Sequence, residues 1–358
     1  MISSNKKNES PKAYARKQVL WSVLFVVIAA LSIFVVMQQS REFSIARLID
    51  FFKNSSPLWL VISFCSMLCF IVFEAMALLL LCRAFGYKQR LSHGILYSTG
   101  DIYFSAITPS ATGGQPVSAY FMVKNGIPPM VVTVILLANL LMYILAIIAI
   151  GLICFIFFPG IFAHFSPFSK LLIIIGSIVQ VALALFFLML LRHEKLLHRI
   201  SSFFLHLLCK LRILKNEEAK KKKLANYMAS YREYSVLLSG HSKTLAFTFV
   251  FNFLQRIAQI AITMFTYLAS GGAVSKALDL MALQGYVVLG SNSIPIPGAM
   301  GVCDYLMLDG FGAIMSESAA VNLELVSRSF SFYICIIICG LVTLWGYRTF
   351  KKRDKKKK

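Results

Sequence analysis

Residues 291–307, which read SNSIPIPGAMGVCDYLM, decide how the rest of this chain is organised. The stretch lies in a strongly apolar chain, yet it holds two prolines, two glycines and an aspartate. A continuous transmembrane helix disfavours that composition. Irregular backbone at membrane depth is tolerated only where protein or a water-filled cavity covers it. We therefore expect this stretch to be a break in the helical backbone that lines a cavity.

Composition places the chain among polytopic membrane proteins. Of its 358 residues, 58% are hydrophobic and only 14% are charged, and the mean hydropathy is +0.74, well above that of soluble domains. Most of the net charge of +21 lies in residues 1–17, 192–243 and 351–358. Because these stretches flank apolar runs, the positive-inside rule and attraction to anionic lipid explain them better than nucleic acid binding does.

The cysteines and histidines do not indicate a metal site or a disulfide framework. The eight cysteines contain no CxxC pair, and the six histidines form no cluster with ligand spacing. Cysteines inside apolar helices act as small hydrophobic residues, so we expect no metal and no cofactor. The first apolar run has no small-residue cleavage site after it, and we expect it to be an anchor.

Six apolar runs are long enough to cross a bilayer. We expect full spans at residues 19–37, 57–82, 129–158, 169–191, 244–269 and 326–347. Two further apolar segments, residues 94–124 and 274–310, are interrupted by glycine and proline. The predicted fold is an all-α integral membrane protein with about six full transmembrane helices plus two opposed re-entrant hairpins, six to eight spans in all.

Charge also predicts the domain limits and the orientation. Residues 18–348 would form one transmembrane domain, with basic tails at 1–17 and 349–358 and a basic amphipathic loop at 192–243. The positive-inside rule places both termini and the basic loop in the cytoplasm. That arrangement requires each interrupted segment to enter and leave on one side, the first on the cytoplasmic side and the second on the outer side.

The two halves then correspond to an inverted-topology repeat, as in many transporters. Residues 112–122, TGGQPVSAYFM, laid on residues 297–307, PGAMGVCDYLM, give four identities in eleven positions. Gly113 pairs with Gly298 and Tyr120 pairs with Tyr305. The alternative is an ordinary eight-span bundle in which both segments are kinked helices.

Arg256 is the ionisable residue that most needs an explanation, because it lies at the middle of the fifth span and charge at membrane depth is costly. The same helical face carries three polar side chains, Asn252, Gln259 and Thr263. The pattern predicts a cationic site for an anionic lipid headgroup. The alternative is a buried ion pair with Glu74 or Asp304. Glu74 and Asp101 are themselves candidates for a proton site or a counter-ion.

The two breaks suggest a second element of the lipid site. A half-helix that begins near the midplane aims free N–H groups and its positive dipole end at a ligand, which suits a phosphate. The lipid-binding residues predicted here are Gly113, Gly114 and Gln115 in the first break and Gly298, Gly301 and Asp304 in the second. Capping of the helix start is the commoner role for Asp304. Three further polar residues, Asn139, Tyr143 and Gln180, could add polar lining to the site. Interhelical hydrogen bonding is at least as good an explanation for them.

Over residues 15–348 the chain resembles the lysylphosphatidylglycerol synthase transmembrane (flippase-like) family, which includes the membrane half of bacterial multiple peptide resistance factors. The family motif Pro-x-Pro-Gly-Gly-x-Gly-x-x-Glu is matched at Pro295, Pro297, Gly298, Gly301 and Asp304, with Ala299 in place of a glycine and Asp304 in place of the glutamate. The first motif, at Pro109 and residues 113–115, lacks the acid and the arginine that the family often carries there. Arg328 with Tyr333 resembles a family arginine–aromatic pair, which adds Arg328 to the expected lipid-binding residues.

The resemblance implies translocation of lysylphosphatidylglycerol or a related anionic or zwitterionic lipid across the bacterial cytoplasmic membrane, with a role in resistance to cationic antimicrobial peptides. We expect no catalytic residues, because no synthase domain follows the last span. One alternative is phosphatidylglycerol lysyltransferase activity, alone or with a separate synthase, and only this would involve nucleic acid, as lysyl-tRNA. Another is a non-transporting scaffold that docks partners through residues 192–243. The sequence does not predict the lipid headgroup, the direction of transport, its energy source or the oligomeric state.

Overall fold

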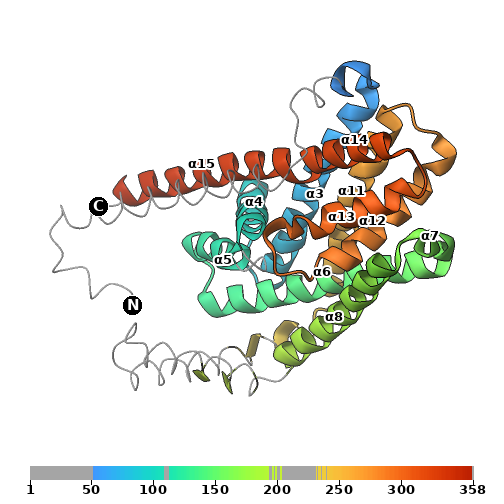
Figure 1. Ribbon diagram of the computed structural model, residues 1–358. Helices are drawn as coiled ribbons and strands as arrows, with labels where there is room; N and C mark the ends of the chain where they lie inside the picture. The colour runs from blue at the N-terminus through green and yellow to red at the C-terminus, as the bar shows by residue number, and fades with distance from the viewer. Residues whose placement is uncertain are drawn as a thin grey trace. The chain divides into compact units, whose positions relative to one another are not determined.

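The computed structural model describes residues 51–108, 113–192 and 241–356, together with isolated positions between 193 and 240; side chains are described only as far as residue 350 at the C-terminal end. All of these belong to the compact unit Ile45–Lys358. The expected first span at 19–37, the tail at 1–17, residues 109–112 and most of the basic loop at 192–243 lie outside the described residues. The described part is helical, with no strand in it (Figure 1).

Five long helices are apolar enough to cross a membrane. They are α3 (Pro57–Ala84), α6 (Pro129–Phe157), α8 (Pro167–Arg192), α11 (Ser242–Ala269) and a continuous run made of α14 (Glu317–Arg328), a π-helical turn (Ser329–Ile334) and α15 (Cys335–Lys356). Prolines at the first turn open α3 and α6, where the missing N–H costs no hydrogen bond. These helices confirm the predicted all-α fold, and five of the six expected spans coincide with them.

The last span begins earlier than the hydropathy pattern predicts. Its first part, α14, carries Glu317 and Glu324, so it is not part of the apolar run that begins at residue 326. Ala320, Leu323 and Val326 nevertheless follow one side of the helix and are buried. An amphipathic helix that packs against protein does not need continuous apolar sequence.

Both interrupted segments fold as pairs of short helices. The first comprises α4 (Leu91–Ile107) and α5 (Gly114–Lys124), and the second comprises α12 (Ala277–Ser291) and α13 (Val302–Gly312), with a single turn at Pro297–Ala299 between them. Helices of this size extend only about 16–26 Å, at about 1.5 Å per residue, which is less than the bilayer core of about 30 Å. Within each pair the two helices pack against one another (Figure 1). The two predicted hairpins are therefore present.

The helices repeat with the register that the sequence alignment suggested. α3 and α11 are both 28 residues long, and the offset that pairs Gly113 with Gly298 also superposes the first and last residues of α3 on those of α11. Each helix ends in the same left-handed glycine turn, at Gly86 (φ 82°) and Gly271 (φ 83°). The Gly86 N–H donates to the Arg83 carbonyl over 2.9 Å, and the Gly271 N–H donates to the carbonyl three residues before it over 3.1 Å. Both are helix ends that only glycine adopts without strain.

The two repeats are inverted relative to one another. α3 and α11 pack along their whole length, more extensively than any other helix pair in the described chain. Their contacts run in opposite directions: the N–H of Ser56, just before α3, bonds the carbonyl of Ala269 at the end of α11, whereas the later Glu74 bonds Gln255. The corresponding helices α3 and α11 are thus antiparallel, as an inverted-topology repeat requires.

Each hairpin is embedded in its own apolar cluster. Tyr97 and Phe121 of the first hairpin are fully buried among residues of α3 and α6. Tyr286 and Phe311 of the second are fully buried among residues of α6, α7 (Pro159–His164) and α8. These clusters pack around the outer parts of the hairpins. The breaks between α4 and α5 and between α12 and α13 therefore lie between the two repeats.

Candidate functional site

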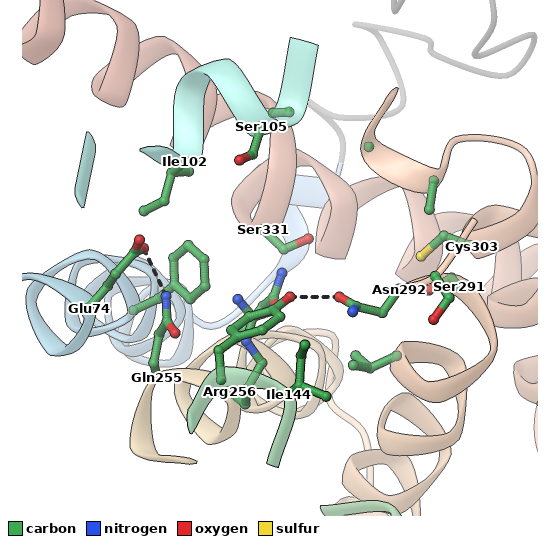
Figure 2. A pocket seen from close by; sticks show the side chains of 18 of the residues that line it. Glu74, Ile102, Ser105, Ile144, Gln255, Arg256, Ser291, Asn292, Cys303 and Ser331 are labelled. Carbon is green, nitrogen blue, oxygen red and sulfur yellow. Dashed lines mark hydrogen bonds between the residues drawn. The ribbon is translucent and has the colours of Figure 1, made fainter. Parts of the chain in front are cut away.

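A cavity of about 710 Å³ lies where the two hairpins approach one another. Both hairpins line it, together with α3, α6, α8, α11 and the junction of α14 with α15 (Figure 2). The lining includes eight of the residues predicted from sequence: Glu74, Asp101, Gln115, Asn252, Arg256, Gln259, Gly298 and Arg328. Four other predicted residues are not part of the lining, namely Gly113, Gly114, Gly301 and Asp304. The cavity has the size of a typical small-ligand site.

Arg256 is buried at this cavity, with only 8% of its surface exposed. Its guanidinium lies 4.4 Å from the ring centre of Tyr143 and 5.2 Å from that of Phe70. Its Nη1 donates to Oε1 of Gln259 over 2.5 Å, while its Nε has no hydrogen-bond partner among the described residues. Aromatic faces stabilise a desolvated cation without neutralising it. The site therefore holds a positive charge that can still receive an anion.

The acidic residues weighed as partners of Arg256 are engaged elsewhere. Within the described chain, no carboxylate lies within ion-pair distance of Arg256. Glu74 instead accepts a hydrogen bond at Oε2 from Nε2 of Gln255 over 2.9 Å (Figure 2). The same oxygen accepts from the Ser98 hydroxyl over 3.4 Å. These bonds tie α3 to α11 and to α4. The buried ion pair with Glu74 or Asp304, the alternative weighed from sequence, is not formed.

Asp101 links the two helices of the first hairpin, α4 and α5, through hydrogen bonds. Its Oδ2 accepts from Nε2 of Gln115 over 2.6 Å, and its Oδ1 accepts from the Ser105 hydroxyl over 3.0 Å. Gly114 fits against this group so tightly that a methyl group on it would overlap the Asp101 carboxylate and the Ser105 hydroxyl. The Gly113 N–H donates to Oγ1 of Thr108 over 2.9 Å. In this conformation, the two glycines serve the packing of the hairpin and do not open the backbone to the cavity.

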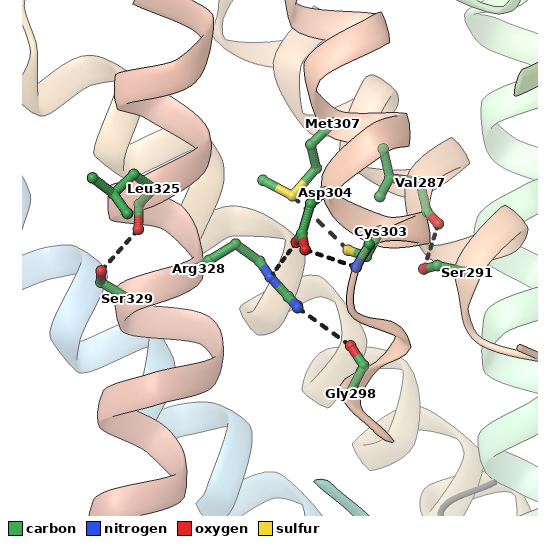
Figure 3. Close-up of polar contacts among 10 residues, drawn as sticks. Val287, Ser291, Gly298, Cys303, Asp304, Met307, Leu325, Arg328 and Ser329 are labelled. Carbon is green, nitrogen blue, oxygen red and sulfur yellow. Dashed lines mark hydrogen bonds and ion pairs between the residues drawn. The ribbon is translucent and has the colours of Figure 1, made fainter. Parts of the chain in front are cut away.

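In the second hairpin, Asp304 joins the start of α13 to α14 (Figure 3). Its Oδ2 accepts the Gly301 N–H over 2.9 Å, and its Oδ1 lies 2.8 Å from Nε of Arg328. Nη2 of Arg328 donates to the Gly298 carbonyl over 3.3 Å. The Gly301 N–H, which was expected to face a phosphate, is therefore occupied by the cap of its own helix. Capping, the commoner role considered for Asp304, is the observed one, and its ion-pair partner is Arg328 rather than Arg256.

Two residues of the site, Gln255 and Asn292, were not predicted from the sequence. Gln255 lies three residues after Asn252, so the polar face of α11 already contained it. Asn292 lies inside the opening stretch, and its Oδ1 accepts from the Tyr143 hydroxyl over 2.7 Å (Figure 2). Tyr143 thus touches the second hairpin with its hydroxyl and Arg256 with its ring. Asn139 and Tyr143 lie four residues apart on α6. Such a polar pair indicates that this face of the helix points inward, but it does not identify the residue that each side chain contacts.

Comparisons with known proteins agree with this architecture. The chain is 24% identical over 253 residues to a UPF0104 membrane protein of Pyrococcus horikoshii, covering 68% of this chain and 73% of the relative. It also matches the family described as the lysylphosphatidylglycerol synthase TM region over residues 19–339. With its long apolar helices, the protein is a multi-pass membrane protein. The match extends over nearly the whole chain, and the protein therefore belongs to the lysylphosphatidylglycerol synthase transmembrane-region family.

Proposed function

We propose that this protein moves an anionic or zwitterionic phospholipid, lysylphosphatidylglycerol being the first to test, between the leaflets of the bacterial cytoplasmic membrane. The observation that carries the proposal is Arg256, a buried cation with no carboxylate within ion-pair distance in the described chain, in a cavity between two inverted hairpins. Burying an unpaired charge is costly, and a lipid phosphate offsets that cost.

The surroundings of the cavity fit a lipid with its chains outside. Several apolar side chains of α8 are exposed on its outer face, including Leu171, Ile178 and Leu185. In a bilayer such a face contacts acyl chains. The headgroup would enter the polar cavity while the tails remain in the membrane. Glu74 and Asp101 would act there as counter-ions or proton carriers. Delivery of a lysylated lipid to the outer leaflet would lower its negative charge and hence the binding of cationic antimicrobial peptides.

The orientation is part of the proposal. The basic tails and the loop at 192–243 place both termini in the cytoplasm under the positive-inside rule. The first hairpin then reaches in from the cytoplasmic side and the second from the outer side. Alternate opening of the two hairpins around one cavity would give access to each leaflet in turn.

The test is translocation of a fluorescent phosphatidylglycerol in proteoliposomes, followed by bleaching with an impermeant reductant. Arg256→Ala should slow translocation at least about tenfold, since a hydrogen bond to a charged group contributes about 1.5–3 kcal/mol. Arg83→Ala removes the same charge at an exposed helix end and should leave the rate unchanged. Equal rates for the wild type and Arg256→Ala would exclude this site.

The family name favours a second candidate, lysyl transfer from lysyl-tRNA to phosphatidylglycerol. Lipid extracts of cells that express this chain and no other synthase decide between the two. New lysylphosphatidylglycerol in such cells would establish the transferase. Its absence, together with translocation in proteoliposomes, would leave lipid movement as the activity.

A further inference from the structure

Tyr143 connects the buried cation of the cavity to the second hairpin. Its ring centre lies 4.4 Å from the guanidinium of Arg256, and its hydroxyl donates to Oδ1 of Asn292 over 2.7 Å (Figure 2). Tyr143 belongs to α6, Arg256 belongs to α11, and Asn292 follows the last residue of α12. One side chain therefore joins the proposed anion site to a hairpin whose opening the proposed function requires.

Few polar contacts hold the break of the second hairpin, residues 292–301, to the rest of the protein. In the described chain two hydrogen bonds connect it to helices outside the hairpin, one from Tyr143 to Asn292 and one from Arg328 to the Gly298 carbonyl. The backbone of the break is left-handed at Gly298 (φ 60°) and at Ala299 (φ 50°). That conformation is strained for alanine, and such strain is common at switch regions. Loss of the Tyr143 bond would thus free one of two polar attachments of a segment suited to movement.

An anion bound to Arg256 would weaken the contact between Arg256 and Tyr143. The aromatic face attracts the guanidinium because the guanidinium carries a net positive charge. The Nε of Arg256 has no hydrogen-bond partner in the described chain, so a donor is available to an anion. Once an anion neutralises the charge, the attraction between the guanidinium and the ring falls. The ring of Tyr143, and with it the bond to Asn292, is then held less firmly.

We propose that Tyr143 is a positioning residue that couples occupancy of the Arg256 site to opening of the second hairpin. While the site is empty, the guanidinium holds the ring where its hydroxyl binds Asn292, and the hairpin stays closed. When an anion binds, that hold weakens and the hairpin opens more readily. Such coupling is reciprocal, so an open hairpin also favours the bound anion. The inference rests on the proposed function for the nature of the anion and adds the link between binding and movement.

Tyr143→Phe separates the two contacts, because it keeps the ring and removes only the hydroxyl. The reporter is Ser293→Cys in a background without native cysteines, which serves as the parent protein. Ser293 follows Asn292, lines the cavity and has a buried hydroxyl with no partner in the described chain. The rate of maleimide labelling is measured on the purified full chain in detergent, with and without phosphatidylglycerol. Equilibrium binding of the same lipid is measured alongside.

In the parent protein the lipid should speed labelling about two- to tenfold, the range that corresponds to loss of one neutral hydrogen bond. Tyr143→Phe should label at the faster rate without lipid, and the lipid should then add little. The affinity of Tyr143→Phe for phosphatidylglycerol should not fall, since the ring beside Arg256 is retained.

Tyr286→Phe is the matched control. Tyr286 lies in α12 of the same hairpin, and its hydroxyl donates to the Phe158 carbonyl over 3.3 Å, away from the cavity lining. This variant should leave the labelling rate and its response to lipid unchanged. Asn292→Ala removes the acceptor of the Tyr143 bond and should reproduce Tyr143→Phe. The double variant should label no faster than either single variant.

The outcomes separate this inference from the proposed function. If the parent protein binds phosphatidylglycerol but Tyr143→Phe labels as the parent does, with and without lipid, only the coupling is overturned. Loss of lipid binding in Tyr143→Phe also overturns it, because the hydroxyl would then serve binding itself. Equal acceleration in Tyr286→Phe would show general loosening of the hairpin and would overturn it too. If the parent protein does not bind the lipid, the proposed function fails and the link to lipid binding fails with it.

Discussion

Arg256 shows how a sequence can indicate which way a residue faces without identifying the side chains that it contacts. Its position at mid-span and its polar neighbours predict an inward face, and the cavity confirms that direction. Its contacts are two aromatic rings and Gln259 instead of an acid. Cation–π contacts stabilise a buried guanidinium while leaving its charge available. Helical periodicity cannot predict such contacts, because the rings belong to other helices.

Gly114 gives the sharpest stability prediction at the residue scale. A methyl group there would overlap the Asp101 carboxylate and the Ser105 hydroxyl, so Gly114→Ala must displace the Asp101–Gln115 bond or the backbone of α5. We expect a loss of about 1–3 kcal/mol, measured as a lower thermal unfolding midpoint in detergent. Gly160→Ala, where the added carbon meets nothing within 4 Å, is the control and should be nearly neutral.

Among the elements, α13 and α14 are joined by an ion pair in addition to their apolar packing. Asp304 caps α13 through the Gly301 N–H and also pairs with Arg328, and the π-helical turn Ser329–Ile334 follows directly after that arginine. π-helical turns occur often at functional sites. The second hairpin is thus fastened to the last span at a point where the helix is irregular, and Gly298 is held there by the same arginine.

A double-mutant cycle tests this connection. Asp304→Ala and Arg328→Ala should each destabilise the protein by about 1–3 kcal/mol, because each leaves a charged partner poorly compensated. The double variant should cost less than the sum, with a coupling of about 1 kcal/mol or more. Asp279→Ala, which removes an acid from the first turn of α12, should show no coupling to Arg328→Ala. Strict additivity of the first pair would contradict the ion pair.

At the scale of the whole described unit, the inverted repeat determines how the cavity is built. α3 and α11 run antiparallel through the centre, and each hairpin contributes its broken end to the same space. One cavity is therefore contacted by two equivalent elements that arrive from opposite directions. This arrangement is typical of alternating-access transporters.

The repeat predicts opposite exposure of two equivalent turns. Lys88 follows the glycine turn after α3, and Lys276 follows the glycine turn after α11; both are exposed. In a background without native cysteines, Lys88→Cys should react with an impermeant maleimide only in inside-out vesicles, and Lys276→Cys only in intact cells. Labelling of both from one side would contradict an inverted arrangement in the membrane.

Much of the fold could be read from the sequence, because hydropathy and breaks are local properties. Five long spans, two interrupted segments and the register of the repeat follow from apolar run length and from prolines and glycines. The start of the last span was missed because α14 is amphipathic. Eight of the twelve predicted site residues line the cavity, since intramembrane polar residues face inward whatever their exact partners.

The stretch at 291–307 by itself determined that the backbone breaks there, because proline and glycine act on their own residue and its neighbours. Only the tertiary structure decided that Asp304 pairs with Arg328 and that Gln255 binds Glu74. Those partners lie on different helices, and helical periodicity predicts which face a residue occupies but not which helix meets that face. The pairing depends on the antiparallel packing of α3 with α11 and of α13 with α14, which is a property of the assembled fold.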